Sequence, residues 1–463
     1  MKLYVKEKKK SVRWNTLRIT AAGFLSFIFF GGVILYLPVS NTRPIAFMDA
    51  LFTSVSAVCV TGLVTITPAV QFTFFGKLVL LLLIQMGGLG VIACAALFFF
   101  LLRRKITVRE RVVLEETYGT GSLGGIVRMV RKVIWGTLFV EGLGAVLYAV
   151  QFIPEYGFIR GVWYSIFHAV SAFCNAGIDI LGENSLAGYA VNPVINMTTI
   201  LLIIVSGIGF TVWFDILENV RRLIHREVPG RWWFTRLRLH SKLAIIMTSV
   251  LILSGAVFIF FSEFHNPDTI GNMSLGQKAM ASLFQSVTTR TAGFYTFSQG
   301  ALHEESKLFC AILMFIGGSP GGTAGGVKTT TFAMLFLACL TFIRGGSDTE
   351  CMGRRISVAN FRTGFCVVMA AFTAFITGTL AILFIEPDSI TLVNVIYETA
   401  SAVGTVGLTA DLTPQLERLS QVILMVMMYV GRLGPLTLVL TFAGKSHPRD
   451  KIRSLPKEQI MVG

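Results

Sequence analysis

Charged residues are scarce in this chain. Asp, Glu, Lys and Arg together supply only 14% of its 463 residues, whereas a soluble globular protein carries roughly 25%. Hydrophobic residues make up 54%, and phenylalanine alone occurs 38 times. So few charges cannot cover the surfaces of several soluble domains. The composition therefore excludes a string of such domains and predicts an all-α polytopic membrane protein embedded in the lipid bilayer.

Paired metal-binding and redox motifs are also absent. The seven cysteines include no C-x-x-C pair and the six histidines show no ligand spacing, which excludes a disulfide framework and a zinc site. Residues 321–329 (GGTAGGVKT) differ from a phosphate-binding loop because Val327 separates the glycine from the lysine, and no strand precedes them. We therefore expect that this chain is not an enzyme and binds no nucleotide.

Eight apolar stretches are long enough to cross a bilayer, which needs about 20 residues per helix. They are 16–38, 74–102, 130–153, 194–218, 242–262, 307–342, 361–385 and 416–443. With eight spans both termini lie on one side, and the segments on that side hold 31 of the 40 Lys and Arg residues. Because these residues concentrate in cytoplasmic loops, the net charge of +15 predicts a cell-membrane protein with cytoplasmic termini, and not a nucleic-acid-binding protein. The outer segments are net acidic, which raises the local cation concentration.

Four shorter apolar segments lie between paired spans, and each ends on a glycine. The segments are 46–62, 161–177, 277–293 and 391–407, and their glycines are 115, 116 and 114 residues apart. This spacing predicts four consecutive repeats of span, short helix and span. The expected organisation is an N-terminal cytoplasmic tail (1–15), repeats at 16–102, 130–218, 242–342 and 361–443, cytoplasmic loops at 103–129, 219–241 and 343–360, and a C-terminal cytoplasmic tail (444–463).

The short segments predict re-entrant helices, because they are too short to cross the bilayer. Four helix C-termini place partial negative charge around one axis, and a glycine after each helix turns backbone carbonyls toward it. Such a carbonyl ring holds a dehydrated monovalent cation, and no acidic side chain is present to favour a divalent one. We therefore predict a pseudo-fourfold pore whose ion-binding filter consists of Val60, Thr61, Gly62, Asn175, Ala176, Gly177, Thr291, Ala292, Gly293, Thr405, Val406 and Gly407. The alternative, that the glycines merely cap surface helices, does not explain their constant spacing.

Arg290 is the one basic residue close to these glycines in the sequence, three residues before Gly293. A charge buried at this depth needs a partner. We expect a buried ion pair that braces the short helices, with Glu398 as the candidate partner.

Glycines interrupt the second span of every pair. Those of the first two pairs (Gly87, Gly88 and Gly90; Gly207 and Gly209) fit close packing between helices. Residues 317–326 (GGSPGGTAGG) do not, because a helix loses about 1 kcal/mol per glycine and about 3 for proline. We predict an irregular loop inside the membrane that acts as a gate, formed by Gly317, Gly318, Gly321, Gly322, Gly325, Gly326 and Lys328.

Arg432 is a further charge in the middle of a predicted span, and intramembrane charges are functional candidates by default. Facing the pore, it would repel cations or steady the loop, so we assign it to the gate. The alternative is a structural bond to carbonyls freed around Pro435.

At these residues the chain resembles the Trk/Ktr/HKT potassium-uptake superfamily and, within it, the KtrB-type membrane subunits. The resemblance covers nearly the whole length. It rests on SAVCVTGL, SAFCNAGI, TRTAGF and SAVGTVGLT at the four glycines, on GGSPGGTAGGVKTTTF, and on YVGRLGPLT in the last span.

The resemblance implies a potassium-selective pore, because glycines at the four filter positions govern selectivity in that superfamily and all four are glycine here. It implies K⁺ as the transported ion, Na⁺ as a stimulating ion, and gating by the glycine-rich loop and Arg432. It also implies a homodimer on a separate cytosolic KtrA-like ring of nucleotide-binding regulatory subunits.

A rival interpretation is an alternating-access secondary cation transporter that uses the broken sixth span as its substrate site. Folds of that class usually show two repeats, often inverted, with discontinuous helices in both halves. Four parallel repeats fit a pore better. A pore follows the Nernst potential of one ion, whereas the reversal potential of a coupled carrier shifts with the second ion.

Overall fold

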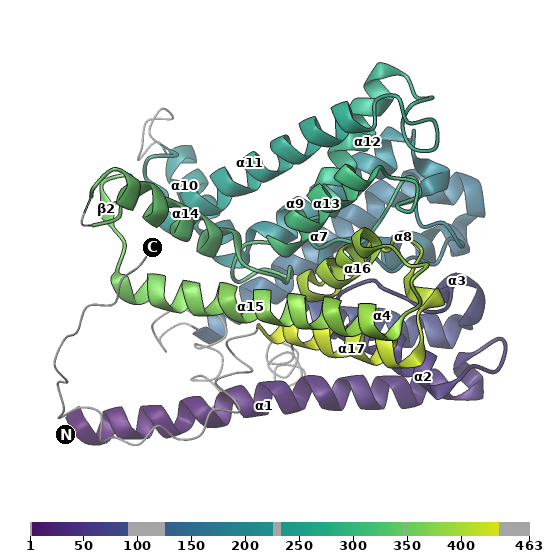
Figure 1. Cartoon of the computed structure of the whole chain (residues 1–463), viewed down its shortest axis with the longest axis horizontal. Coiled ribbons are helices and arrows are strands. Elements are labelled where there is room, and N and C mark those ends of the chain that lie inside the picture. Colours follow the sequence, from purple (N-terminus) through teal and green to yellow (C-terminus); the bar gives the residue numbers. More distant parts are fainter. Residues whose placement is uncertain (1, 91–125, 226–232, 347, 435–463) are drawn as a thin grey trace.

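The computed structural model describes residues 2–90, 126–225, 233–346 and 348–434, and these residues are mostly helical (Figure 1). They also form one antiparallel hairpin, in which β1 (Glu350–Cys351) pairs with β2 (Arg354–Arg355). Several expected segments lie outside the described residues. These are the second half of the second span, most of the loop 103–129, part of the loop 219–241, the end of the eighth span with Pro435, and the tail 444–463.

Four long helices are each followed by a short one. The long helices are α1 (Lys2–Tyr36), α7 (Ile126–Tyr156), α11 (Leu239–Ser262) and α15 (Val358–Ile385). The short helices are α2 (Phe47–Cys59), α8 (Phe158–Cys174), α12 (Leu275–Thr288) and α16 (Leu392–Gly404). Because α1 begins at Lys2, the basic segment expected as a tail belongs to the first long helix.

A further helix or pair of helices follows each short helix. These are α4 (Phe74–Leu89), α9 (Pro193–Ile208) with α10 (Phe210–Ile224), α13 (Glu304–Phe315) with α14 (Thr329–Ile343), and α17 (Arg418–Leu433). Single turns lie in the connections: η1 (Pro38–Ser40), α3 (Pro68–Gln71), η2 (Ala187–Tyr189) and η4 (Thr413–Gln415).

Within the described ranges, three helices are long and apolar enough to cross a membrane, namely α7, α11 and α15. A fourth span results if α9 and α10, which meet at an angle of 96°, are counted together. Among the described residues fewer unbroken spans than the expected eight are found, for two reasons. The second helix of each expected pair is interrupted or leaves the described residues, and the apolar part of α1, Thr20–Tyr36, is too short to be counted.

Polar side chains begin several of these helices. Asn192 accepts hydrogen bonds from the first N–H groups of α9, which also has Pro193 at its first position. Ser274 and Gln277 form a capping box at the start of α12. These caps satisfy N–H groups that have no partner inside the helix, so the starts of α9 and α12 are defined by their own sequence.

Glycines with positive φ end three of the helices. Gly90, Gly209 and Gly434 follow α4, α9 and α17 with φ of +83°, +100° and +84° and ψ of 147°, 142° and 129°. An extended backbone with φ in this range is open almost only to glycine. Gly90 and Gly209 terminate helices. The expected packing role does not describe Gly90, where nothing lies within 4 Å of a Cβ, whereas Gly209 closely approaches the carbonyl of Pro320. The packing role does describe Gly87 and Gly88, which closely approach α2 and α8.

The C-terminal parts of the short helices are buried, and the long helices have exposed apolar faces. Figure 1 shows α8 and α16 in the middle of the molecule, between α1 at one edge and α11 with α12 at the other. Every residue of α16 from Tyr397 to Gly404 is buried. On the long helices, Phe139, Phe261 and Phe384 are 72%, 72% and 93% exposed. Apolar side chains so exposed belong in lipid, so the outer helices supply the membrane-facing surface.

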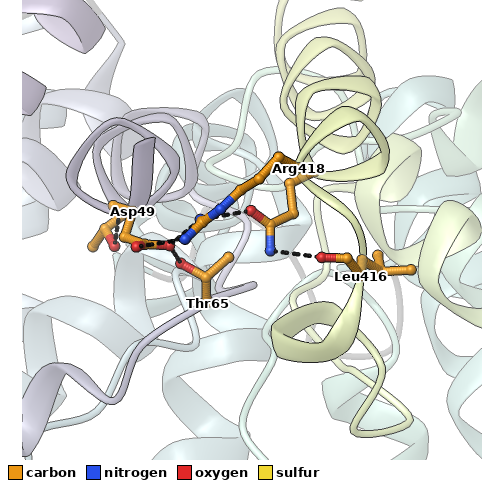
Figure 2. Close-up of polar contacts among 6 residues, drawn as sticks. Asp49, Thr65, Leu416 and Arg418 are labelled. Atoms are coloured by element: carbon orange, nitrogen blue, oxygen red, sulfur yellow. Dashed lines mark hydrogen bonds and ion pairs between the residues drawn. The ribbon is translucent and has the colours of Figure 1, made fainter. Parts of the chain in front are cut away.

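An ion pair joins α2 to α17, near opposite ends of the chain. Arg418 donates from Nη1 to Oδ1 of Asp49 at 2.6 Å and from Nη2 to Oδ2 at 3.2 Å (Figure 2). The same carboxylate accepts a hydrogen bond from Thr65 at 2.9 Å. The side chain of Asp49 is 12% exposed and that of Arg418 is 56% exposed. This bidentate contact ties the first short helix to the start of α17.

Replacing Arg418 with alanine should lower the free energy of unfolding by about 1–2 kcal/mol. A mostly buried carboxylate loses its bidentate partner, while the exposure of the arginine limits the effect. The thermal unfolding midpoint of the purified protein in detergent measures it. The control is Arg222→Ala, which removes an exposed pair with Glu218 inside α10 and should change stability by less than about 0.5 kcal/mol. Equal midpoints for the two variants would contradict this assignment.

Candidate functional site

The four glycines singled out by their spacing lie together at the ends of the four short helices. Gly62, Gly177, Gly293 and Gly407 have φ of +105°, +64°, +83° and +97°. Two residues before each glycine the backbone is again at positive φ, at Val60, Asn175, Thr291 and Thr405. For β-branched residues this conformation is rare and costs about 1–3 kcal/mol each, and such strain is concentrated at functional sites.

The four glycines form a closed ring. A Cβ atom placed on Gly62 would lie 2.6 Å from the carbonyl oxygen of Ala176, and one on Gly177 would lie 2.5 Å from that of Ala292. A Cβ on Gly293 would collide with the carbonyl oxygen of Val406, and one on Gly407 with that of Thr61. Each glycine thus meets the carbonyl of the next segment, and the fourth returns to the first. We call these four glycines and four carbonyls the glycine ring.

The carbonyl oxygens of the glycine ring are available to a ligand. Among the described residues, no N–H or O–H group of the protein donates a hydrogen bond to Thr61, Ala176, Ala292 or Val406 oxygen. Buried backbone carbonyls are almost always paired, so four unpaired ones in one place point to a cation. The ends of four helices add partial negative charge there. The described residues contain no group of three or more His, Cys, Asp or Glu side chains placed to hold a metal ion.

Hydroxyl groups hold the ring segments in two different ways. The N–H groups of Gly62 and Gly407 each donate to a serine hydroxyl, of Ser56 and Ser401, at 2.9 Å. In the other two segments the hydroxyl donates instead. Ser171 donates to Ile178 oxygen and Thr288 to Phe294 oxygen, both at 2.6 Å. The ring is therefore only approximately fourfold.

A cavity of about 240 Å³ opens on one side of the ring. All four glycines line it, together with residues that follow them in the chain, including Thr65 and Thr409. Asp179, Glu183 and Asp411 also line it. Three carboxyl groups around this vestibule attract cations to the glycine ring.

The glycine-rich loop (317–328) lies on the opposite side of the ring. It is not helical and connects α13 to α14, with Ile316 and Val327 paired as a parallel bridge. A Cβ on Gly325 would overlap the hydroxyl of Thr405, so the loop packs directly against a ring segment. Ser319 N–H donates to Gly207 oxygen at 2.9 Å, which fastens the loop to the bend after α9.

Lys328 and Arg432 both donate to backbone carbonyls. Lys328 Nζ donates to Ala324 oxygen at 2.7 Å and to Gly325 oxygen at 3.2 Å, both inside the loop. Arg432, on α17, donates to Thr323 oxygen in the loop and to Gly87 and Gly88 oxygens at the end of α4. The structure therefore brings Arg432 and the loop glycines together next to the ring. The alternative expected for Arg432 is a bond to carbonyls freed around Pro435, and Pro435 lies outside the described residues.

The expected pairing of Arg290 with Glu398 is wrong. Arg290 donates to the carbonyl oxygens of Thr248 (3.2 Å) and Gly317 (3.3 Å). Glu398 instead accepts hydrogen bonds from Thr409 and Thr413. The break after α13 frees Gly317 carbonyl from helical bonding, so the buried guanidinium finds backbone acceptors, while two threonines satisfy the carboxyl group. Arg290 braces the glycine-rich loop, and not the short helix of Glu398.

One residue at this site carries no signal in the sequence. Thr323 lies in the middle of the glycine run. Its side chain bonds to the end of α8, and its carbonyl accepts a hydrogen bond from α17. A single threonine among glycines has no periodicity or motif that would mark it.

Comparisons with known proteins agree with one another. The sequence profile of the TrkH family, described as cation transport protein, matches residues 8–455. The chain is 36% identical over 434 residues to Ktr system potassium uptake protein B of Bacillus subtilis, covering 94% of each. It is 35% identical to the potassium/sodium uptake protein NtpJ of Enterococcus hirae, covering 99% of this chain and 100% of NtpJ.

The fold is also similar to a solved structure. The potassium transporter TrkH from Vibrio parahaemolyticus superposes with a TM-score of 0.68 at 19% sequence identity, covering 91% of this chain and 85% of that one. The family profile spans nearly the whole chain, and the two relatives are more than 30% identical over 94% and 100% of their lengths. Both findings identify the same family. The chain belongs to the TrkH family of cation transport proteins.

Proposed function

We propose that the chain is the ion-translocating subunit of a potassium-uptake system, a gated pore whose selectivity filter is the glycine ring. The observation that carries this proposal is the closed sequence of contacts from Gly62 to Gly407, with four unpaired carbonyl oxygens at its centre. Backbone carbonyls replace the hydration shell of a monovalent cation. Divalent ions prefer carboxylate ligands, and none of the twelve residues of the predicted filter is Asp or Glu.

The relatives support K⁺ as the transported ion. Two carry potassium uptake in their names, and NtpJ carries both potassium and sodium. Na⁺ is accordingly proposed as a second, stimulating ion. A membrane potential of 100 mV is worth roughly 2.3 kcal/mol per charge, which is enough to accumulate K⁺ without ATP.

The proposed architecture is four repeats of span, pore helix and span around one axis. The short helices α2, α8, α12 and α16 are the re-entrant pore helices in this scheme, and the repeats are bounded as 16–102, 130–218, 242–342 and 361–443. The 31 Lys and Arg residues in the segments on one side of the membrane support cytoplasmic termini in a cell-membrane protein. The vestibule then faces outward and the glycine-rich loop faces the cytoplasm.

The gate in this proposal is the glycine-rich loop together with Lys328 and Arg432. The loop packs against Thr405 directly inside the filter and is held there by Arg432 and Arg290. Both arginines and Lys328 donate to backbone carbonyls, which are weaker anchors than carboxylates. A loop held this way can be displaced without breaking an ion pair.

The proposed assembly is a homodimer with a cytosolic KtrA-like ring of regulatory subunits. The Bacillus subtilis relative is named as a component of a Ktr system, which supports a partner subunit. The basic cytoplasmic segments, where most Lys and Arg residues lie, are the proposed docking face. The nucleotide binds the ring in this scheme, and not the membrane subunit.

Gly407→Ser should lower the preference for K⁺ over Na⁺ on the order of tenfold, because any side chain at this position collides with the Thr61 carbonyl. Ion uptake by cells that lack their own potassium-uptake systems measures the ratio. The control is Gly188→Ser, because nothing lies within 4 Å of a Cβ at Gly188. A wild-type ratio in Gly407→Ser would sink the filter assignment.

The reversal potential of the current, measured in the same cells, distinguishes a pore from a coupled carrier. We expect the reversal potential of the wild-type current to follow the K⁺ gradient when external Na⁺ is varied. A reversal potential that moves with Na⁺ by the amount expected for fixed coupling would support the alternating-access transporter instead.

Deleting residues 318–325 should raise potassium flux even without the cytosolic ring, because it removes the segment packed against the filter at Thr405. Initial rates of Rb⁺ uptake at matched amounts of membrane protein measure the effect. The deletion combined with Gly407→Ser is the control, since a flux through the same pore must then prefer K⁺ less than the flux of the single deletion does. Unchanged flux in the single deletion would rule out a blocking loop.

A further inference from the structure

Asn175 differs from the residues at the equivalent positions of the glycine ring. Val60, Thr291 and Thr405 occupy the other three positions, so only the second segment has an amide side chain. Asn175 has φ of 60° and ψ of 43°, a left-handed conformation that asparagine tolerates better than β-branched residues. It is 1% exposed, so its side chain has to find partners inside the protein.

The partner of Asn175 lies in the glycine-rich loop. Its Nδ2 donates to the hydroxyl oxygen of Thr323 at 2.9 Å, and this hydroxyl in turn donates to Phe173 oxygen at 3.2 Å. Phe173 is in the last turn of α8, where helix carbonyls have no partner within the helix. One hydroxyl group therefore holds both the end of α8 and the first residue of its ring segment.

The backbone of Thr323 is held as well. Its carbonyl oxygen accepts a hydrogen bond from Arg432, which also donates to Gly87 and Gly88. Gly88 in turn packs against Cys174, the residue before Asn175. Thr323 thus lies where the loop, α17, the end of α4 and the end of α8 meet, and it is 1% exposed.

Glycines lie on both sides of Thr323 in the loop. Gly321 and Gly326 have φ of +73° and +66°. Glycines on both sides give the flanking backbone the freedom to change conformation. The loop can therefore move on either side of Thr323 while Thr323 stays bonded to α8.

We propose that Thr323 is a specificity-determining positioning residue, which fixes the second segment of the filter from inside the glycine-rich loop. The proposal rests on the filter function proposed above. By holding Asn175 and the end of α8, the Thr323 hydroxyl keeps the Ala176 carbonyl at its place in the ring. Without it, the segment relaxes and the ring contracts around the smaller Na⁺, so the preference for K⁺ falls.

The test is the ratio of K⁺ to Na⁺ uptake in cells that lack their own potassium-uptake systems. Thr323→Val, which keeps the shape but removes the hydroxyl, should lower the ratio on the order of tenfold, equivalent to about 1.4 kcal/mol. Thr323→Ser, which keeps the hydroxyl, should have the wild-type ratio. A ratio does not depend on how much protein reaches the membrane, and Thr323→Ala, a second variant without the hydroxyl, should match Thr323→Val.

The matched control is Thr329→Val. Thr329 is buried at the end of the same loop, and its hydroxyl bonds to Ser319 at 2.8 Å without touching the glycine ring. Thr329→Val should keep the wild-type ratio, whatever it does to total flux. An equal fall in Thr329→Val would show a general effect of the loop and overturn the proposal.

Coupling to the filter is tested by combining variants. Because Asn175 and Thr323 act through one hydrogen bond, Asn175→Ala with Thr323→Val should have no lower ratio than the lower of the two single variants. A wild-type ratio in Thr323→Val or Thr323→Ala, a failure of Thr323→Ser to restore it, or additive effects would overturn the inference. A wild-type protein with no preference for K⁺ would instead overturn the proposed function, so the two failures are distinguishable.

Discussion

Four backbone segments approach one another so closely that none of the glycines at their centre has room for a side chain. Each glycine meets the carbonyl oxygen of the next segment, and this contact closes after Gly407 onto Thr61. The close approach leaves four carbonyls without a protein donor among the described residues. The rest of the fold can be understood as the means of holding these carbonyls in place at membrane depth.

The supporting structure follows from that requirement. The short helices end at the ring with their C-termini, which carry partial negative charge. Serine and threonine hydroxyls fasten the ring segments. The long helices cover the outside with apolar side chains. The positive charges nearest the ring donate to carbonyl oxygens: Arg290 and Arg432 donate to the loop, and Lys328 donates within it. The helix break at Gly90 and the loop supply such acceptors, because they release carbonyls from helical bonding.

The regular spacing of Gly62 and its three counterparts was sufficient to single out the ring residues, since a repeat preserves position through the fold. The density of glycine in 317–326 was likewise sufficient to mark the loop. The hydrogen-bond partners of the buried polar side chains were not predictable. Charge alone pairs Arg290 with Glu398, whereas its acceptors are the Thr248 carbonyl in α11 and the Gly317 carbonyl, which the break after α13 exposes. The role of Thr323 cannot be predicted from the sequence, because its bond to Asn175 joins residues 148 positions apart and depends on tertiary structure.

The central claim, that the four carbonyls form a monovalent cation site, is tested most directly by anomalous diffraction from crystals grown with Rb⁺ or Tl⁺ in place of K⁺. The account predicts an anomalous peak on the axis of the glycine ring, within coordination distance of the oxygens of Thr61, Ala176, Ala292 and Val406. A peak confined to the carboxylates of the vestibule, with none among these four oxygens, would contradict it.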